Sequence, residues 1–187
     1  VASRRLFEVF DRPPEISDNP SGNTPTIITG NLRVENLSYT YTGSKTPALS
    51  DISFNLNKGE TVAIMGRVGS GKTTLLKQIV RLIDPKAETV WIDEHQVSDY
   101  PLSQLRAQVA MVPQDPFLFA EPLKDNLTYD DPNRMLEKIW QAATSADLKN
   151  TIDEFPDKLD TLIGERGVTL SGGQKQRATL ACGLIRN

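Results

Sequence analysis

The sequence predicts an α/β domain, and three observations support that prediction. Residues 32–37 and 52–56 alternate apolar and polar side chains, as half-buried strands do. A continuous apolar run at 61–65 leads directly into a glycine-rich loop and then into a helical stripe of aliphatic residues. Beyond Pro113, apolar residues recur at helical spacing. We therefore expect strands and a strand–loop–helix unit, followed by a mainly helical part.

Length, charge and composition exclude several classes of protein. The chain has 187 residues, which suits one globular unit, and its net charge of −3 lacks the basic excess of proteins that bind nucleic acid. Cys182 is the single cysteine and His95 the single histidine, so we expect neither a disulfide nor a zinc cluster, and the cytoplasm fits best. No apolar stretch is long enough to span a membrane. The start at Val1 lacks a signal peptide and an initiator methionine, so we expect a piece of a longer protein.

The first thirty residues are expected to be a connector and a flexible linker. Residues 1–10 have a short amphipathic helical pattern, which the sequence Asp-Arg-Pro-Pro at 11–14 ends. Ser, Asn, Thr, Pro and Gly then dominate up to Gly30, as in a loose tether. We predict that one domain fills 31–187. Its parts are a β-subdomain and loop-bearing core at 31–112, a mainly helical subdomain at 113–170 and a last helix at 171–187.

The elements of this domain follow from local patterns. The strands at 32–37 and 52–56 are expected to pair antiparallel, and the run at 61–65 to form a strand that is covered on both faces. Leu75, Leu76, Ile79, Val80 and Ile83 mark the helix after the loop. Further helices are predicted at 132–146, 148–155 and 171–186, with the acidic pair at 130–131 as a helix-start charge pair.

The loop between the predicted strand and helix matches the pattern Gly, four residues, Gly-Lys-Ser/Thr. Glycines there let backbone N–H groups curl around a polyphosphate, and the following helix directs the positive end of its dipole at the phosphates. We expect Lys72 to reach the terminal phosphates and Thr73 to offer its hydroxyl to Mg²⁺. Kinases, GTPases and transport ATPases all share this loop. The predicted nucleotide-binding residues are Gly66, Arg67, Val68, Gly69, Ser70, Gly71, Lys72, Thr73 and Thr74.

A second motif opens the last predicted helix. Ser171 and Gln174 have the spacing of a capping box. Gly172 and Gly173 are unusual in a first helical turn because glycine lowers helix stability, unless bare backbone must approach a ligand. A helix N-terminus with free N–H groups and little side-chain bulk is a second anion site. The simpler alternative is a flexible loop that only caps the helix.

The segment from Leu170 to Gln174, followed by Lys-Gln-Arg, resembles the signature motif of the ATP-binding cassette (ABC) family. Tyr41 resembles the aromatic residue that stacks on adenine in this family. Gln114 resembles the glutamine that meets Mg²⁺ and senses the transmembrane partner. The resemblance covers the chain almost without a gap. It implies an antiparallel β-subdomain, a RecA-like P-loop NTPase core and a helical subdomain that ends with the signature helix.

Two further stretches are similar to the exporter branch of the family. Residues 164–167 are similar to a segment that touches the membrane domains, and residues 4–8 with the prolines at 13–14 are similar to the connector after the last membrane helix. The resemblance implies an ATPase at the cytoplasmic face of a membrane. Two such domains, identical or different, pair head to tail and close on ATP and Mg²⁺ between the loop of one and Ser171 of the other. Closure moves the transmembrane domains, and hydrolysis resets them.

The family pattern next requires an apolar strand that ends in Asp-Glu and a switch histidine, and the sequence ends before both. The core is therefore expected to be C-terminally incomplete. Without the groups that steer Mg²⁺ and polarise water we expect ATP binding without turnover, and we assign no catalytic residue. Residues 90–94 imitate the missing strand. The family has a β-subdomain strand and turn there, so we expect an exposed acidic turn, and His95 within it is no switch histidine.

Two alternatives remain beside a transporter domain. ATPases of DNA repair and chromosome maintenance pair the same two motifs, but long heptad repeats separate their motifs, and this sequence has none between Gly66 and Leu170. The other alternative is an ATP-binding fragment without enzyme activity.

Overall fold

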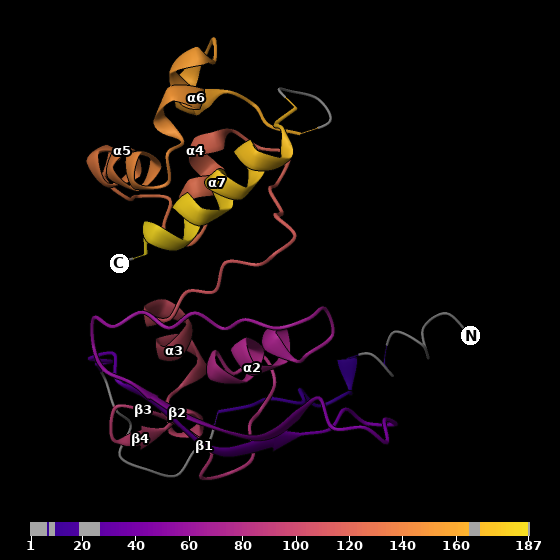
Figure 1. Cartoon of the computed structure of the whole chain (residues 1–187). Helices are drawn as coiled ribbons and strands as arrows, with labels where there is room; N and C mark the ends of the chain where they lie inside the picture. The colour runs from indigo at the N-terminus through magenta and orange to yellow at the C-terminus, as the bar shows by residue number, and fades with distance from the viewer. Residues whose placement is uncertain (1–6, 8–9, 19–26, 165–168, 187) are drawn as a thin grey trace. The chain divides into compact units, whose positions relative to one another are not determined.

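The computed structural model describes residues 7, 10–18, 27–164 and 169–186 (Figure 1). The chain divides into two compact units, the first extending to Val109 and the second beginning at Ala110. Most of the helix predicted at 1–10, and most of the exporter-like segments at 4–8 and 164–167, lie outside the described residues. No helix in the described part of the chain is long and apolar enough to cross a membrane.

The first unit contains an antiparallel sheet of four strands in the order β2-β1-β3-β4. The long strands β1 (Leu32–Tyr39) and β2 (Leu49–Leu56) pair antiparallel, which confirms the prediction from their alternating pattern. The short strands β3 (Val90–Ile92) and β4 (His95–Gln96) extend the sheet beyond β1. Register places Val34 of β1 between Phe54 of β2 and Val90 of β3.

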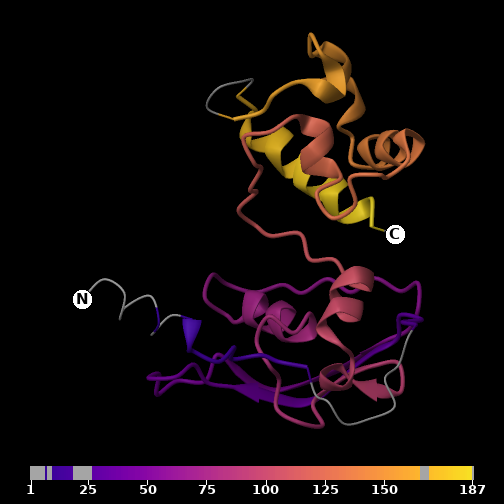
Figure 2. The same ribbon diagram turned by 180° about the vertical axis from the view of Figure 1, so that it is seen from behind.

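Two helices cover one face of this sheet, as both views show (Figures 1 and 2). They are α2 (Lys72–Ile79) and α3 (Leu102–Gln108), and a 3₁₀ turn at Val97–Asp99 precedes α3. Helix α2 is shorter than predicted because the chain turns left-handed soon after it, so Ile83 lies outside the helix. The core of this unit consists of Val34, Leu37, Leu49, Leu75, Val90, Ile92, Val97, Tyr100 and Leu105.

The prediction of a strand at 61–65 is wrong. These residues are extended but pair with no strand in the part of the chain that the structure describes. Val62, Ile64 and Met65 are 46%, 36% and 91% exposed. A strand exists through hydrogen bonds to a neighbour, and a strand buried on both faces needs covering elements as well. Among the described residues this segment has neither, so its apolar composition alone did not produce the strand.

The second unit is helical. It comprises α4 (Leu123–Leu127), α5 (Leu136–Ser145), α6 (Lys149–Glu154), a 3₁₀ turn (Lys158–Asp160) and α7 (Gly172–Leu184). The helices predicted in the regions of α5, α6 and α7 are confirmed. Helix α7 packs on α4 and α5 and buries Ala178 and Ala181 in their shared core.

The acidic pair at 130–131 does not begin a helix as predicted. The Asp130 carboxylate accepts hydrogen bonds from Arg134 Nη2 at 2.7 Å and from Arg186 Nε at 3.2 Å. Arg134 Nη1 also donates to the carbonyl of Ile185 at 2.6 Å, so this charge cluster holds the end of α7. Helix α5 begins later, and its first turn carries Glu137 in place of the predicted pair.

Candidate nucleotide-binding site

The glycine-rich loop at 66–71 is a tight turn between the extended segment and α2. Gly69 and Gly71 have φ values of 81° and 87°, a left-handed conformation that glycine adopts without steric cost. Gly71 also lies directly against the start of β2, because a Cβ at this position would overlap the carbonyl oxygen of Ala48. The pattern therefore places glycine where the backbone turns and where it packs most closely.

Lys72 is the first residue of α2, and its ammonium group folds back over the loop. Its Nζ donates to the carbonyl oxygens of Gly66 and Arg67, both at 2.8 Å. These bonds fix the cation beside the backbone turn, which is the position from which it can reach a phosphate bound in that turn. The loop thus concentrates positive charge where the sequence predicts it.

The N-terminus of α2 has no side-chain cap. Its N-cap residue is Gly71, so no side chain accepts from the first backbone N–H groups of the helix. Such uncapped donors, together with the helix dipole, favour an anion. Thr73, in the same first turn, has an exposed side chain that suits a hydroxyl ligand, whereas Thr74 is buried.

Tyr41 is tied to this helix. A hydrogen bond of 3.0 Å joins its hydroxyl to Thr74 Oγ1, and Tyr39 packs edge-on against its ring at 4.9 Å between centroids. The ring is 42% exposed, so part of it remains accessible. The structure therefore brings Tyr41 to the helix that follows the loop, at Thr74 of the predicted site. The hydroxyl contact was not foreseen from the sequence.

The signature segment opens α7 with the predicted capping box, which is confirmed. Gln174 N donates to Ser171 Oγ at 3.3 Å, and Ser171 N donates to Gln174 Oε1 at 2.8 Å. Gly172 and Gly173 follow Ser171 on the exposed surface, and a Cβ on Gly172 would meet no atom within 4 Å. Packing among the described residues therefore does not require Gly172. Leu170, just before the cap, is buried in the core of the second unit.

Gln114 lies in a bend in the second unit, and its side chain is exposed. The predicted nucleotide-site residues are thus divided between the units. Tyr41 and the loop belong to the first unit, whereas Gln114 and the signature segment belong to the second.

Asp93, in the segment that imitates a metal-binding strand, has a structural role. Its carboxylate accepts hydrogen bonds from the backbone N–H groups of Thr29, Gly30 and Asn31 and from the Thr29 hydroxyl. Burial alone would raise the pKa of Asp93, but the bonds from Thr29, Asn31 and Gly30 outweigh it and lower the pKa to about 2. The predicted strand and turn are present, but the turn is not simply exposed, because Asp93 is half-buried.

No three His, Cys, Asp or Glu side chains among the described residues form a group that could hold a metal ion.

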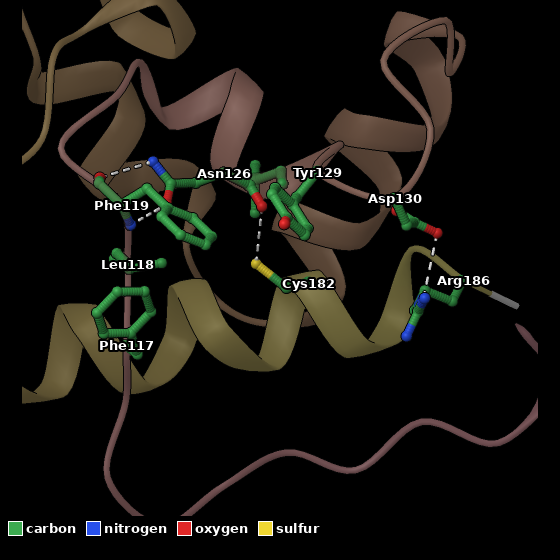
Figure 3. A pocket seen from close by; sticks show the side chains of 9 residues that line it. Phe117, Leu118, Phe119, Asn126, Tyr129, Asp130, Cys182 and Arg186 are labelled. Atoms are coloured by element: carbon green, nitrogen blue, oxygen red, sulfur yellow. Dashed lines mark hydrogen bonds and ion pairs between the residues drawn. The ribbon is translucent and has the colours of Figure 1, made fainter. Parts of the chain in front are cut away.

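An aromatic pocket of about 290 Å³ in the second unit was not predicted (Figure 3). Phe119 stacks on Tyr129 at 4.9 Å between centroids, and Phe117 meets Phe119 edge-on at 5.0 Å. The amide of Asn126 fixes Phe119 through both of its backbone polar groups, at 2.7 and 3.1 Å. The cluster of aromatic residues shortly after Gln114 was the available signal. Its partner Tyr129 comes from beyond α4, so proximity in the sequence did not reveal the pocket.

Cys182 lies in the same pocket and donates its thiol to the carbonyl of Asn126 at 3.4 Å (Figure 3). Burial raises the pKa of this thiol to about 11. The thiol therefore stays protonated near neutral pH, and the residue packs as a small apolar group.

The family model that describes the ABC transporter matches residues 49–187. The chain is 40% identical over 188 residues to the ATP-dependent lipid A-core flippase of Photobacterium profundum, covering 100% of this chain and 32% of the relative. It is 33% identical over 187 residues to the heavy metal tolerance protein of Schizosaccharomyces pombe, covering 100% of this chain and 22% of the relative. The chain thus spans about a third of the length of most of these curated relatives.

A solved structure of a bacterial Atm1-family ABC exporter with ATP bound has the same fold. It superposes with a TM-score of 0.89 and 30% sequence identity over 99% of this chain and 32% of that chain. This likeness shows the α/β P-loop NTPase architecture that the sequence predicts, with its antiparallel β-subdomain and helical subdomain. Together with the motif geometry and the family match, it shows that the chain belongs to the ABC transporter family, as an ATP-binding domain of the exporter type.

Proposed function

We propose that this chain binds Mg-ATP and serves, within a longer protein, as the ATPase domain of an exporter. One observation carries the proposal: the uncapped start of α2 lies beside the Lys72 ammonium, over a loop whose glycines leave its backbone accessible. This arrangement suits the phosphates of a nucleotide. The exposed hydroxyl of Thr73 and the amide of Gln114 are the groups that would hold Mg²⁺, whose chemistry is to neutralise phosphate charge.

The adenine base is expected to stack on Tyr41. The half-exposed ring and its link to Thr74 support this role, because the hydroxyl bond limits rotation of a ring that adjoins the loop. Stacking accepts any purine face, so Tyr41 contributes affinity and little discrimination among bases.

A second ATP-binding domain is the expected partner. The signature segment presents Ser171 and two glycines at an exposed helix N-terminus, and packing in the described part of the chain does not need Gly172 there. We propose that this segment contacts the nucleotide bound to the loop of a partner domain. The partner is either a second copy or a different domain of the same family.

The transmembrane domains are the other expected partner, with the chain at the cytoplasmic face of the membrane. Phe117 and Tyr129 are 68% and 71% exposed at the aromatic pocket, a short distance along the chain from Gln114. Exposed aromatic side chains around a pocket are typical of protein interfaces. We propose that the pocket receives an intracellular segment of the membrane domain and that Gln114 senses its position.

ATP binding is tested by titration with a fluorescent ATP analogue in the presence of Mg²⁺. Lys72→Ala should weaken binding at least about tenfold, because it removes a charge-assisted contact to phosphate. Lys77→Ala is the matched control, since Lys77 lies in the last turn of the same helix. Equal affinity of the Lys72→Ala variant and the unchanged chain would refute the proposed site.

A further inference from the structure

The connector contacts the rest of the first unit at two adjacent residues, Ser17 and Asp18. The carbonyl oxygen of Ser17 accepts a hydrogen bond from Arg81 Nη2 at 2.8 Å. The carboxylate of Asp18 accepts one from the backbone N–H of Leu102 at 2.7 Å, at the first residue of α3. These residues precede the start of β1 by more than ten positions, so neither contact is imposed by the sheet itself.

Arg81 is almost fully buried and uses each of its side-chain nitrogens. The side chain is 4% exposed, with Nε donating to Asp84 at 2.7 Å and Nη1 to the carbonyl of Tyr100 at 3.3 Å. The third bond is the one to Ser17. A buried guanidinium needs all of its donors satisfied, so the connector carbonyl belongs to its set of partners.

The backbone at Arg81 gives independent support. The residue follows α2 with φ of 52°, the left-handed conformation that glycine usually supplies after a helix. Glycine would adopt it without strain, whereas arginine is strained there. The side chain therefore compensates for that strain through its three contacts.

The two residues that anchor the connector are Arg81 and Leu102. Each adjoins a helix that is connected along the chain to residues of the proposed nucleotide site. Arg81 follows the helix that begins with Lys72, and Leu102 begins the helix that precedes the segment with Gln114. The eight residues of α2 connect the anchor at Arg81 to the loop, and backbone hydrogen bonds between residues i and i−4 link successive turns of such a helix.

We propose that Ser17 and Asp18 form a connector latch, in which Arg81 is the positioning residue, and that the latch couples the connector to the P-loop helix. The inference rests on the proposed function, because it concerns how a membrane-domain connector and the ATP site influence each other. Such coupling is reciprocal: nucleotide at the loop changes the state of the connector, and release of the connector changes the response to nucleotide.

A spin label on the connector tests the latch in the whole 187-residue chain. The label is placed at Glu15→Cys in a Cys182→Ala background, since Glu15 is exposed and close to the anchors. In the parent, the label should be restricted, and Mg-ATP should change its spectrum. Asp18→Ala should shorten its rotational correlation time about threefold and abolish the response to Mg-ATP.

Matched variants separate the latch from a general loss of structure. Asp18→Asn keeps an oxygen acceptor for Leu102 N–H and should restore the restricted spectrum. Ser17→Ala should have no effect because the contact uses the backbone carbonyl. Arg81→Lys keeps the positive charge but loses the geometry with which the guanidinium group donates its three hydrogen bonds, so it should increase the mobility of the spin label. Arg106→Gln, an exposed charge change on α3, is the control for charge alone.

The outcomes are distinct. If Arg81→Lys fails to fold, Asp18→Ala still decides the question, because Asp18 is exposed and outside the core. Nucleotide binding is measured on the same samples. If the parent does not bind nucleotide, that result contradicts both the proposed function and the coupling. The comparison of label mobility still decides whether Asp18 anchors the connector. Bound nucleotide with an unchanged parent spectrum overturns the coupling. Equal mobility in the parent and in Asp18→Ala overturns the latch.

Discussion

Asp93 shows that the environment of a residue decides its role. Its apolar-Asp-Glu context suggests a metal ligand, but its carboxylate is occupied by donors from Thr29, Gly30 and Asn31. Because its folded-state pKa is about 2, below the ordinary value of 3.8, Asp93 stabilises the fold above pH 3.8. This contribution is lost as the pH falls from 3.8 towards 2. Discounted for partial exposure, it amounts to about 1–2 kcal/mol.

Urea unfolding over this acidic range measures that contribution. Asp93→Asn should lower the free energy of unfolding near neutral pH and should remove part of its decrease below pH 3.8. The neighbouring Glu94→Gln is the control and should leave the free energy of unfolding near neutral pH almost unchanged, since Glu94 is exposed. An unaltered profile in Asp93→Asn would show that the hydrogen bonds at residues 29–31 do not lower the pKa of this carboxyl.

The side-chain amide of Gln78 makes no visible contribution to the stability of the fold. Its side chain is fully buried in α2, and neither its amide nitrogen nor its amide oxygen has a hydrogen-bond partner among the residues that the structure describes. Burying an unpaired amide lowers stability, so Gln78→Leu should raise the free energy of unfolding by about 1–2 kcal/mol. Urea denaturation measures the change. Gln141→Leu on the exposed face of α5 serves as control and should have little effect, and destabilisation by Gln78→Leu would mean that the amide is satisfied in solution.

At the scale of elements, the loop at 66–71 depends on one glycine more than on the others. Gly71 combines a left-handed φ with direct contact to the Ala48 carbonyl, whereas Gly69 has a similar φ but open space around it. Gly71→Ala should therefore lower the free energy of unfolding by at least about 2 kcal/mol, and Gly69→Ala by about 1 kcal/mol. Thermal unfolding measures both. Equal effects would show that φ alone decides and that the contact with Ala48 relaxes.

Most of the elements that the sequence predicted have a long local pattern. β1, β2 and α7 each carry enough turns or alternations to be recognised without tertiary information. α3 and α4 have seven and five residues, which show little of a helical period, and both were missed, whereas α6, with six residues, was recognised within the pattern at 148–155. Residues 61–65 have the composition of a strand, but strand formation depends on a neighbour that local composition does not specify.

The candidate site likewise has features that local sequence predicts and features that depend on tertiary packing. The loop and the capping box are contiguous in sequence, so the residue types and their spacing contain the geometry. The bond between Tyr41 and Thr74, and the stack of Phe119 on Tyr129, join residues whose proximity arises only from packing. The sequence therefore predicted the local geometry of the loop and of the capping box, but it contained no information on what holds the surrounding side chains in place.

At the scale of the whole molecule, the first unit exposes an apolar strip at 61–65. The strip adjoins a groove of about 410 Å³ lined mainly by apolar residues, among them Leu49, Ile52 and Phe54. Exposed apolar backbone without a strand partner favours pairing with another chain. We expect the 187-residue chain to associate as its concentration rises, as sedimentation would show, and Met65→Lys to weaken this association. Leu82→Lys, at an exposed residue outside the strip, should not.

The arrangement of the carboxylates predicts that a chain of these 187 residues binds ATP without steady-state turnover. Hydrolysis requires a group that polarises or orients water near the terminal phosphate, and the family resemblance implies a carboxylate in that role. The Asp-Glu pair at 93–94 is the one that resembles such a group, yet the hydrogen bonds from residues 29–31 occupy Asp93, and β3 lies in the antiparallel sheet beside β1.

Phosphate release by the purified chain measures turnover. It should remain at background, and Glu94→Gln, alone or with Asp93→Asn, should leave that background unchanged while ATP binding persists. The single variant matters because Glu94 is exposed, so its substitution should not disturb the fold. Robust phosphate release that Glu94→Gln abolishes would show instead that this turn supplies the catalytic carboxylate. That outcome would require β3 to lie beside the bound phosphates. In the structure, however, β3 lies on the side of β1 away from β2.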